Sequence, residues 1–491
     1  MKRKFLVNLG FLLFLNFLIK PMWIFGIDRT VQNTVGVGEY GFYFVIFNFS
    51  LIFNILLDLG ITNFNNRNIA QSNQLLNKHF SGILVLKFFL GFLYFAVIFL
   101  VALLVGYNNM QLKILGILGL NQLFLSLILY FRSNISGLLY FKTDSILSIL
   151  DRLLMIVFCG ILLWANPFEG PFRIQWFIYA QTLAYFLTAI IGFIIVVNYA
   201  RFRKLNWNWP FFLMILKKSA PFALLFLLMA FYSWLNPVLL ETILEEKVGN
   251  DEAGIYAMGY RLLDAATMIA FLFAGLLMPI FSKMIKMNEP IGEIVKLSFT
   301  LIITFAVIVV AGSVFYAHDI MTLLYNSHIE EATPVFRFLM IGFLSTSMTY
   351  IFGSLLTANG NLKQLNIIAA ISVLINFSMN LILVPHLMAL GSAIASFATL
   401  LFTAIAQVFL AQRIFRLKIN IKFLITLSLF TGIVFMLNFI SSQLPVQLQG
   451  FSEQSVQIGK LVAVALISSI IAFGMKMVSI RSMLTIIRRE T

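Results

Sequence analysis

The chain has 491 residues, of which 61% are hydrophobic and only 11% are charged. With a mean hydropathy of +0.97, this composition excludes a soluble globular protein and indicates a polytopic membrane protein. The net charge of +15 does not indicate nucleic-acid binding, because most of the cations lie at the ends of apolar segments.

A membrane-spanning helix needs about 20 mainly apolar residues, and fourteen segments of the chain meet this requirement. We predict spans at approximately 5–25, 40–59, 80–105, 114–130, 146–164, 176–197, 221–240, 255–281, 294–316, 336–356, 365–383, 387–410, 421–439 and 461–478. The longest connections, 198–220 and 317–335, leave no room for a soluble catalytic domain. The predicted fold is therefore an all-α polytopic membrane protein with about 14 transmembrane helices.

The distribution of Lys and Arg predicts the orientation of these helices. If the N-terminus is cytoplasmic, 24 of the 34 cations fall on inner ends and loops and only five on outer loops. This bias places both termini inside under the positive-inside rule. The basic start Met1-Lys2-Arg3-Lys4 has no small-residue cleavage site after it, so we interpret the first apolar segment as a span. The single Cys159 cannot form an intramolecular disulfide and is expected to be packed.

One motif, V-G-x-x-E-x-G-x-Y, occurs twice, from Val35 to Tyr43 and from Val248 to Tyr256, with five of nine positions identical. Both copies follow an apolar helix that carries a proline and precede another apolar helix. Internal duplication is common among membrane transporters. We therefore predict an N-terminal lobe at 1–205, a C-terminal lobe at 206–418, and two appended helices with a cytoplasmic tail at 419–491.

The first predicted span contains Lys20 next to Pro21. The proline removes the hydrogen bond to the carbonyl of Phe17, so we expect a kink at this point. A lysine this far into a span is expected to face the protein interior or a watery cavity, although a snorkelling anchor is the alternative.

Several polar groups lie near the predicted inner ends of the following spans. Asp58 ends the second span, and the loop after it contains Asn66 and Arg67, which we interpret as a gate or as a solvated cap. Lys87 and Arg152 lie near the inner ends of later spans, and we expect them to be anchors at the inner face.

The second half repeats some of these features. The seventh span contains Asn236 before Pro237, where we expect a polar hinge. The eighth carries Arg261 and Asp264, which share one helical face. They could form a structural ion pair, because an unpaired charge in this position costs about 2.5 to 3.5 kcal/mol.

Motifs of common enzymes are missing from the chain. G-x-x-x-x-G-K-[ST], G-x-S-x-G and H-E-x-x-H are absent, no two aspartates are two residues apart, and the four histidines do not cluster. We therefore expect neither an enzyme nor a resident cofactor or metal.

Six segments of the chain, in this order, form a recognisable pattern: Phe25-Gly26-Ile27-Asp28-Arg29, Val35 to Tyr43, Leu57-Asp58-Leu59-Gly60-Ile61, Asn65-Asn66-Arg67-Asn68, Ser219-Ala220-Pro221-Phe222, and Gly254-Ile255-Tyr256 to Tyr260-Arg261-Leu262-Leu263. With these segments the chain resembles bacterial polysaccharide flippases of the multidrug/oligosaccharidyl-lipid/polysaccharide exporter superfamily. The resemblance implies two six-helix lobes around a central cavity, two extra helices, and export of a lipid-linked oligosaccharide, usually carried on undecaprenyl pyrophosphate.

A pyrophosphate can cross a bilayer only along a path lined by cations or polar groups. On this basis we assign substrate contacts and residues of gating or structural importance. The substrate contacts are Lys20, Arg261, Arg29 and Asn236, and the gating or structural residues are Asp58, Asp264, Asn66, Arg67, Pro21 and Pro237. The expected location is the bacterial inner membrane, and the expected partners are membrane lipids and, for polysaccharide assembly, a polymerase and a chain-length regulator.

The seventh span departs from the family pattern, because many relatives carry Arg and Asp where this chain has Tyr232 to Pro237. We therefore expect weak or absent ion coupling at this position. Two other functions remain open. A multidrug exporter of the same superfamily would be driven by sodium or protons and would favour an intramembrane acid over Lys20, whereas a polysaccharide polymerase or ligase would need a long outer loop.

Overall fold

We describe the chain from a computed structural model. The description covers residues 15–16, 18–62, 65–66, 69, 72–165, 167, 170–200, 207, 209–417, 420–444, 453–475 and 477. Arg67 and both ends of the chain lie outside these residues, so the predicted cytoplasmic termini stay a prediction.

The described chain is helical throughout, which confirms the predicted fold class. Ten of its helices are long and apolar enough to cross a membrane, and the shorter apolar helix α3 (Val37–Ile52) adds to them. Every predicted span from the second onward coincides with a helix, whereas most of the first span lies outside the described residues. The protein is therefore a multi-pass membrane protein.

The chain divides into two compact units, residues 1–254 and 255–491. The lobe boundaries predicted from the sequence stay a prediction.

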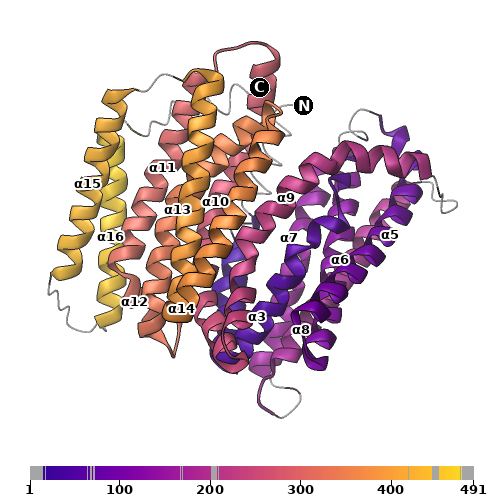
Figure 1. Cartoon of the computed structure of the whole chain (residues 1–491), viewed down its shortest axis with the longest axis horizontal. Coiled ribbons are helices and arrows are strands. Elements are labelled where there is room, and N and C mark those ends of the chain that lie inside the picture. The colour runs from indigo at the N-terminus through magenta and orange to yellow at the C-terminus, as the bar shows by residue number, and fades with distance from the viewer. Residues whose placement is uncertain are drawn as a thin grey trace. The chain divides into compact units, whose positions relative to one another are not determined.

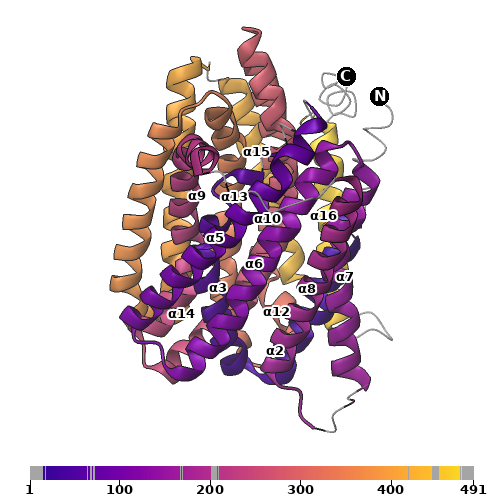
Figure 2. The same ribbon diagram turned by 90° about the vertical axis from the view of Figure 1, so that its right-hand side faces the viewer.

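In the first unit, α6 packs against the three helices α5, α7 and α8 (Figure 2). Their bounds are Gln74–Val105 for α5, Asn109–Gly137 for α6, Phe141–Gly160 for α7 and Ile174–Tyr199 for α8, and a π-helix, η3, continues α7 through Ile161–Ala165. Helix α3 packs against α6 and against α9 (Trp209–Ile243). The core between α5, α6 and α8 is apolar and includes the stacked rings of Phe80 and Tyr130.

The first helix is distorted next to Pro21, as its sequence predicts. A π-helix, η1 (Met22–Asp28), begins directly after the proline, and the N–H of Arg29 bonds the carbonyl of Ile24. An α-helix, α2 (Arg29–Val35), follows and ends at Gly36, whose φ of 86° favours glycine. The helical segment therefore continues about ten residues beyond its predicted end at residue 25.

In the second unit, α13 (Ile329–Ala358) packs against both α11 (Gly292–Phe315) and α14 (Leu362–Phe415). Helix α14 is interrupted at Met388, whose φ of 51° and ψ of −130° are not helical. Its two halves correspond to the predicted spans 365–383 and 387–410. Helix α10 (Glu246–Lys286) begins nine residues earlier than predicted and enters this unit from the first.

The connection predicted at 317–335 contains a short helix, α12 (Ala317–Leu324). The last two helices, α15 (Ile421–Gln443) and α16 (Glu453–Gly474), pack against each other and against α11 (Figure 1). Val307, Phe430 and Ala472 are buried where these three helices meet.

The two copies of the repeated motif contact each other within the first unit. A Cβ added to Gly41 would meet the backbone of Asn250 and would lie 2.8 Å from the nitrogen of Gly254. A Cβ added to Gly254 would lie 2.9 Å from the carbonyl carbon of Val37. The seventh position of each copy thus packs on the third position of the other. Only glycine allows the N-terminal turns of α3 and α10 to cross at this distance.

Candidate functional site

A buried lysine stabilises the broken end of the second membrane helix. Helix α3 ends at Ile52, and a short 3₁₀ helix, η2 (Asn54–Leu57), follows it. Lys87 Nζ donates to the carbonyl of Leu57 at 3.0 Å, to Asp58 Oδ1 at 2.5 Å and to Ser126 Oγ at 2.8 Å. An ammonium has three donors, so all three are used. Irregular backbone at membrane depth requires partners of this kind.

The expectation that Lys87 anchors the inner face is wrong, because its side chain is 0% exposed. Its helix begins six residues before the predicted span, which places Lys87 well inside it. The Asp58 carboxylate also accepts bonds from the N–H and hydroxyl of Thr62. Lys87 and Asp58 therefore form a structural pair that joins α5 to η2, and the gating role of Asp58 stays a prediction.

Neutral polar groups continue this network. Asn54 Nδ2 donates to Gln122 Oε1 at 2.7 Å, and Gln122 Nε2 donates to Ser50 Oγ at 3.3 Å. The hydroxyl of Tyr94 donates to the carbonyl of Ser50 at 2.9 Å. These bonds satisfy polar groups around the break between α3 and η2.

A second cluster surrounds the guanidinium of Arg152 on α7. Its central carbon lies 5.7 Å from the ring centre of Trp23 and 5.9 Å from that of Tyr185. Nη1 donates to the hydroxyl of Tyr185 at 3.0 Å, and Nε lies 3.9 Å from Asp151 Oδ2. Aromatic faces and a carboxylate together stabilise a cation inside the lobe.

The Arg152 cluster has the chemistry of an anion-binding site. The guanidinium presents five N–H donors, and among the described residues no hydrogen-bond partner engages Nη2. The side chain is 29% exposed, so it is not completely enclosed by protein. A planar guanidinium of this kind suits a phosphate, which can accept two parallel hydrogen bonds.

The expectation that Arg152 is an inner-face anchor is also wrong. Helix α7 begins at Phe141, five residues before the predicted span, and the spanning segment reaches Ala165. Arg152 therefore lies near the middle of the segment. The signal that could have revealed its importance is a charged pair, Asp151-Arg152, inside an apolar span.

The predicted substrate residues of the first unit occupy different elements. Lys20 is half-buried in the helical segment before η1, one turn ahead of Trp23, and Arg29 is half-buried at the start of α2. Asn236 and Pro237 are buried within α9. Lys20 thus lies on the segment that also carries Trp23, which contacts Arg152. The substrate roles of Lys20, Arg29 and Asn236 stay predictions.

Three other predicted residues occupy separate places. Arg261 is half-buried and Asp264 is exposed, both on the part of α10 that belongs to the second unit. Their pairing stays a prediction. Asn66 is half-buried, and its carbonyl lies 3.2 Å from the point where a Cβ on Gly137 would be.

The chain matches a sequence family described as polysaccharide biosynthesis protein over residues 8–285. This range covers more than half of the chain. No curated protein matches the sequence.

Several solved structures share the fold at low sequence identity. A lipid II flippase MurJ in an inward closed conformation is 15% identical, with a TM-score of 0.65 over 94% of this chain and 98% of that one. An inward-facing multidrug resistance transporter of the MATE family and MOP superfamily is 12% identical, with a TM-score of 0.60 over 80% and 94%. A MOP superfamily transporter from Pyrococcus furiosus is 13% identical, with a TM-score of 0.57 over 84% and 96%.

Proposed function

Because the chain belongs to the polysaccharide biosynthesis protein family, we propose that it is a flippase for lipid-linked oligosaccharides. The substrate is an undecaprenyl-pyrophosphate-linked repeat unit, moved from the cytoplasmic to the periplasmic leaflet of the inner membrane. The product serves the assembly of a surface polysaccharide such as O-antigen, capsule or exopolysaccharide. The fold shared with MurJ and with MATE transporters supports a transport role over catalysis.

The observation that carries the proposal is the Arg152 cluster. A charged side chain in the interior of a membrane protein is costly in free energy and usually marks a functional site, and Arg152, 29% exposed, keeps N–H donors available there. Pyrophosphate is the charged part of the proposed substrate, which lipid cannot solvate, and Arg152 supplies the matching charge. Lys20, on the segment that carries Trp23, supplies a second cation in the first unit, and Arg261 supplies one in the second.

The direction of transport follows from the charge of the substrate. With the cell interior negative, outward movement of an anionic headgroup is favoured by about 2.3 kcal/mol per charge per 100 mV. Alternating access, in which a transporter opens its binding site to each side of the membrane in turn, would move the headgroup while the polyprenyl chain stays in the bilayer. The pairing of Asp58 with Lys87 leaves this acid engaged, which fits transport without an ion bound there.

Reconstitution tests the proposal directly. Purified protein in liposomes should expose a labelled undecaprenyl-linked oligosaccharide to an enzyme outside the vesicles, and liposomes without protein should not. In cells, loss of the protein should trap lipid-linked repeat units on the cytoplasmic leaflet and remove the surface polysaccharide, where a polymerase and a chain-length regulator would act next. Extrusion of organic cations without exposure of the oligosaccharide would instead identify a multidrug exporter. This function is the second candidate, because the chain shares its fold with a MATE transporter.

The assigned cations give the residue-level test. Lys20→Ala and Arg261→Ala should each slow flipping without lowering the amount of folded protein, whereas Lys422→Ala, an exposed lysine on α15, should change neither. If Arg261→Ala instead lowers the amount of protein and Asp264→Ala restores it, the two residues form a structural pair.

A further inference from the structure

A pocket of about 660 Å³ lies at one end of the first unit, where α2, the start of α3 and the start of α8 meet. It is lined by Thr34, Val35, Glu39, Pro171, Phe172, Arg173, Gln175, Trp176 and Tyr179. Its size falls within the range of about 300 to 1,000 Å³ that small-ligand sites occupy. None of these residues belongs to the Arg152 cluster.

The pocket belongs to the outer side of the membrane under the predicted orientation. Its residues come from α2, from the connection between α7 and α8, and from the adjoining starts of α3 and α8, and the distribution of Lys and Arg assigns this end of the helices to the periplasm. A ligand bound here would therefore be one that has already crossed the bilayer or that arrives from outside.

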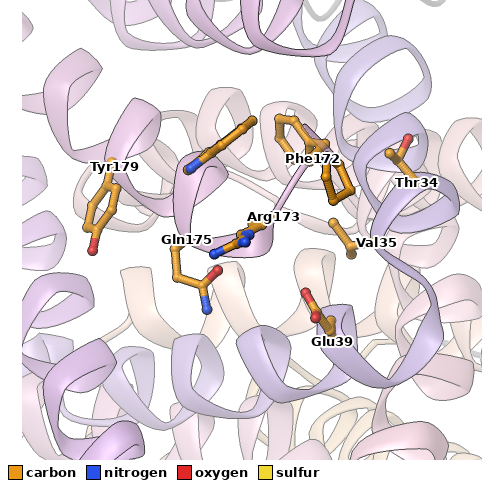
Figure 3. A pocket seen from close by; sticks show the side chains of 9 residues that line it. Thr34, Val35, Glu39, Phe172, Arg173, Gln175 and Tyr179 are labelled. Carbon is orange, nitrogen blue, oxygen red and sulfur yellow. The ribbon is translucent and has the colours of Figure 1, made fainter. Parts of the chain in front are cut away.

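The lining combines aromatic faces with groups that form hydrogen bonds. Phe172 and Trp176 pack edge to face, with ring centres 6.0 Å apart, and Tyr179 is 53% exposed. Arg173 and Gln175 lie between Tyr179 on one side and Thr34 and Val35 on the other (Figure 3). Among the described residues, no hydrogen bond or ion pair engages the side chain of Glu39, Arg173 or Gln175, so their donors and acceptors are open to a ligand.

The charges of the pocket narrow the choice of ligand. Glu39 and Arg173 carry opposite charges, so the pocket favours neither an anion nor a cation as a whole. A phosphate headgroup would gain from Arg173 but would be repelled by Glu39. A neutral ligand rich in hydroxyls can bond both groups and the amide of Gln175 at once, while its C–H faces lie on the aromatic rings.

We propose that this pocket binds the saccharide part of the transported lipid-linked oligosaccharide on the outer side. The proposal rests on the proposed function and extends it, because it assigns the sugar and the pyrophosphate to separate sites. Val35 and Glu39 belong to the repeated motif whose glycines cross at α3 and α10. A bound saccharide therefore contacts the segment that holds the two copies of the motif together.

Saturation-transfer NMR tests the proposal with purified full-length protein. The probe is the repeat-unit oligosaccharide released from its lipid by mild acid, so that neither the polyprenyl chain nor the pyrophosphate contributes to binding. Trp176→Ala should weaken binding by about tenfold or more, because it removes one aromatic face. Glu39→Gln and Arg173→Gln should weaken it less. Trp164→Ala, which removes a 68% exposed tryptophan from η3 outside the pocket, should leave binding unchanged.

The outcomes separate the pocket from the transport proposal. If the wild type flips the lipid-linked oligosaccharide but does not bind the free saccharide, or if Trp176→Ala binds it as the wild type does, the pocket proposal fails and the flippase proposal stands. If the saccharide binds with the expected dependence on Trp176 but nothing is flipped, the pocket stands and the transport proposal fails. Displacement of the saccharide by glycerol phosphate at equal concentration would identify a lipid-headgroup site and overturn the proposal.

Discussion

The two units of the chain use different polar chemistry in their interiors. Among the described residues, the buried charged side chains are Asp28, Lys87 and Asp151, and all three belong to the first unit. The buried polar side chains of the second unit are hydroxyls and amides, such as Ser372 and Thr403. On its short helix α12 and at the start of α13, exposed histidines lie close to glutamates: His318 Nε2 is 3.2 Å from Glu330 Oε1, and His328 Nδ1 is 3.8 Å from Glu331 Oε1.

This difference shows what each kind of group requires of the fold. In the second unit, the hydroxyls of Ser372 and Thr403 each lie within hydrogen-bond distance of a carbonyl of their own helix and 2.7 Å from each other, so one donates to a carbonyl and the other donates to its partner hydroxyl. Such groups are largely satisfied before any helix packs against them. A buried charge needs partners from other helices, as Lys87 takes them from η2 and α6. The stability of the first unit should therefore depend more strongly on each single hydrogen-bond partner than the stability of the second unit does.

The largest effect is expected from Lys87→Met. It leaves the Asp58 carboxylate without its cation and the Leu57 carbonyl with fewer donors, so the free energy of unfolding should fall by about 3 to 5 kcal/mol. The double variant Lys87→Met with Asp58→Asn should recover most of this loss. Denaturant unfolding of the purified protein in detergent measures both. A single variant as stable as the wild type would contradict the structural role of the pair.

Arg152→Gln is expected to have the next largest effect, on transport. Loss of a charge-assisted hydrogen bond to phosphate costs about 2 kcal/mol, so flipping in liposomes should slow by about 30-fold. Arg152→Lys should be intermediate, because it keeps the charge but loses the planar fork. The matched control is Arg132→Gln on α6, which breaks the 2.8 Å bond to Asp144. It should lower stability while the flipping rate per folded molecule stays the same. Equal rates for Arg152→Gln and the wild type would remove Arg152 from the site.

The crossing of the two motif copies predicts a smaller loss of stability. A methyl group at Gly41 would meet the backbone of Asn250, which cannot move without separating α3 from α10. Gly41→Ala should therefore destabilise by about 1 to 3 kcal/mol. Gly432→Ala on α15 meets nothing within 4 Å and should stabilise the helix by up to about 1 kcal/mol. Thermal unfolding of the two variants should move in opposite directions, and a common direction would exclude a close crossing.

The smallest effect is expected in the second unit. Ser372→Ala removes one hydroxyl from the pair with Thr403, which keeps its bond to the carbonyl of Thr399. The loss should be about 0.5 to 1.5 kcal/mol, as for a neutral hydrogen bond, when measured by the same denaturant unfolding as Lys87→Met. A loss in the free energy of unfolding as large as that of Lys87→Met would show that buried neutral groups contribute as much to stability as buried charges. The proposed difference between the two units would then be wrong.

The helices could be predicted well because membrane spans require long apolar segments. The spans predicted at 80–105 and 421–439 correspond to α5 at Gln74–Val105 and α15 at Ile421–Gln443. The ends were less certain, since polar residues such as those at the start of α7 can continue a helix beyond its apolar part. Helix α7 begins at Phe141, five residues before the predicted span 146–164. The later predicted start places Arg152 near the inner end of the span and not near its middle.

The candidate site could be predicted only in part. Lys20 and Arg152 both fall in predicted spans, but the sequence predicts only an anchoring role for Arg152, because its partners Trp23 and Tyr185 are far from it in the sequence. The buried role of Lys87 depends in the same way on Asp58 and Ser126, which are 29 and 39 residues away.

The sequence by itself determined that this chain is a multi-pass helical membrane protein with a repeated motif and few internal charges, because apolar length and residue identity are local properties. Only the tertiary structure decided what those charges and glycines do. Lys87 supports a broken helix, Arg152 packs against Trp23 and Tyr185, and Gly41 and Gly254 let the two motif copies cross. Each of these roles depends on which helices approach within a few ångströms of each other, and packing between distant segments sets that distance.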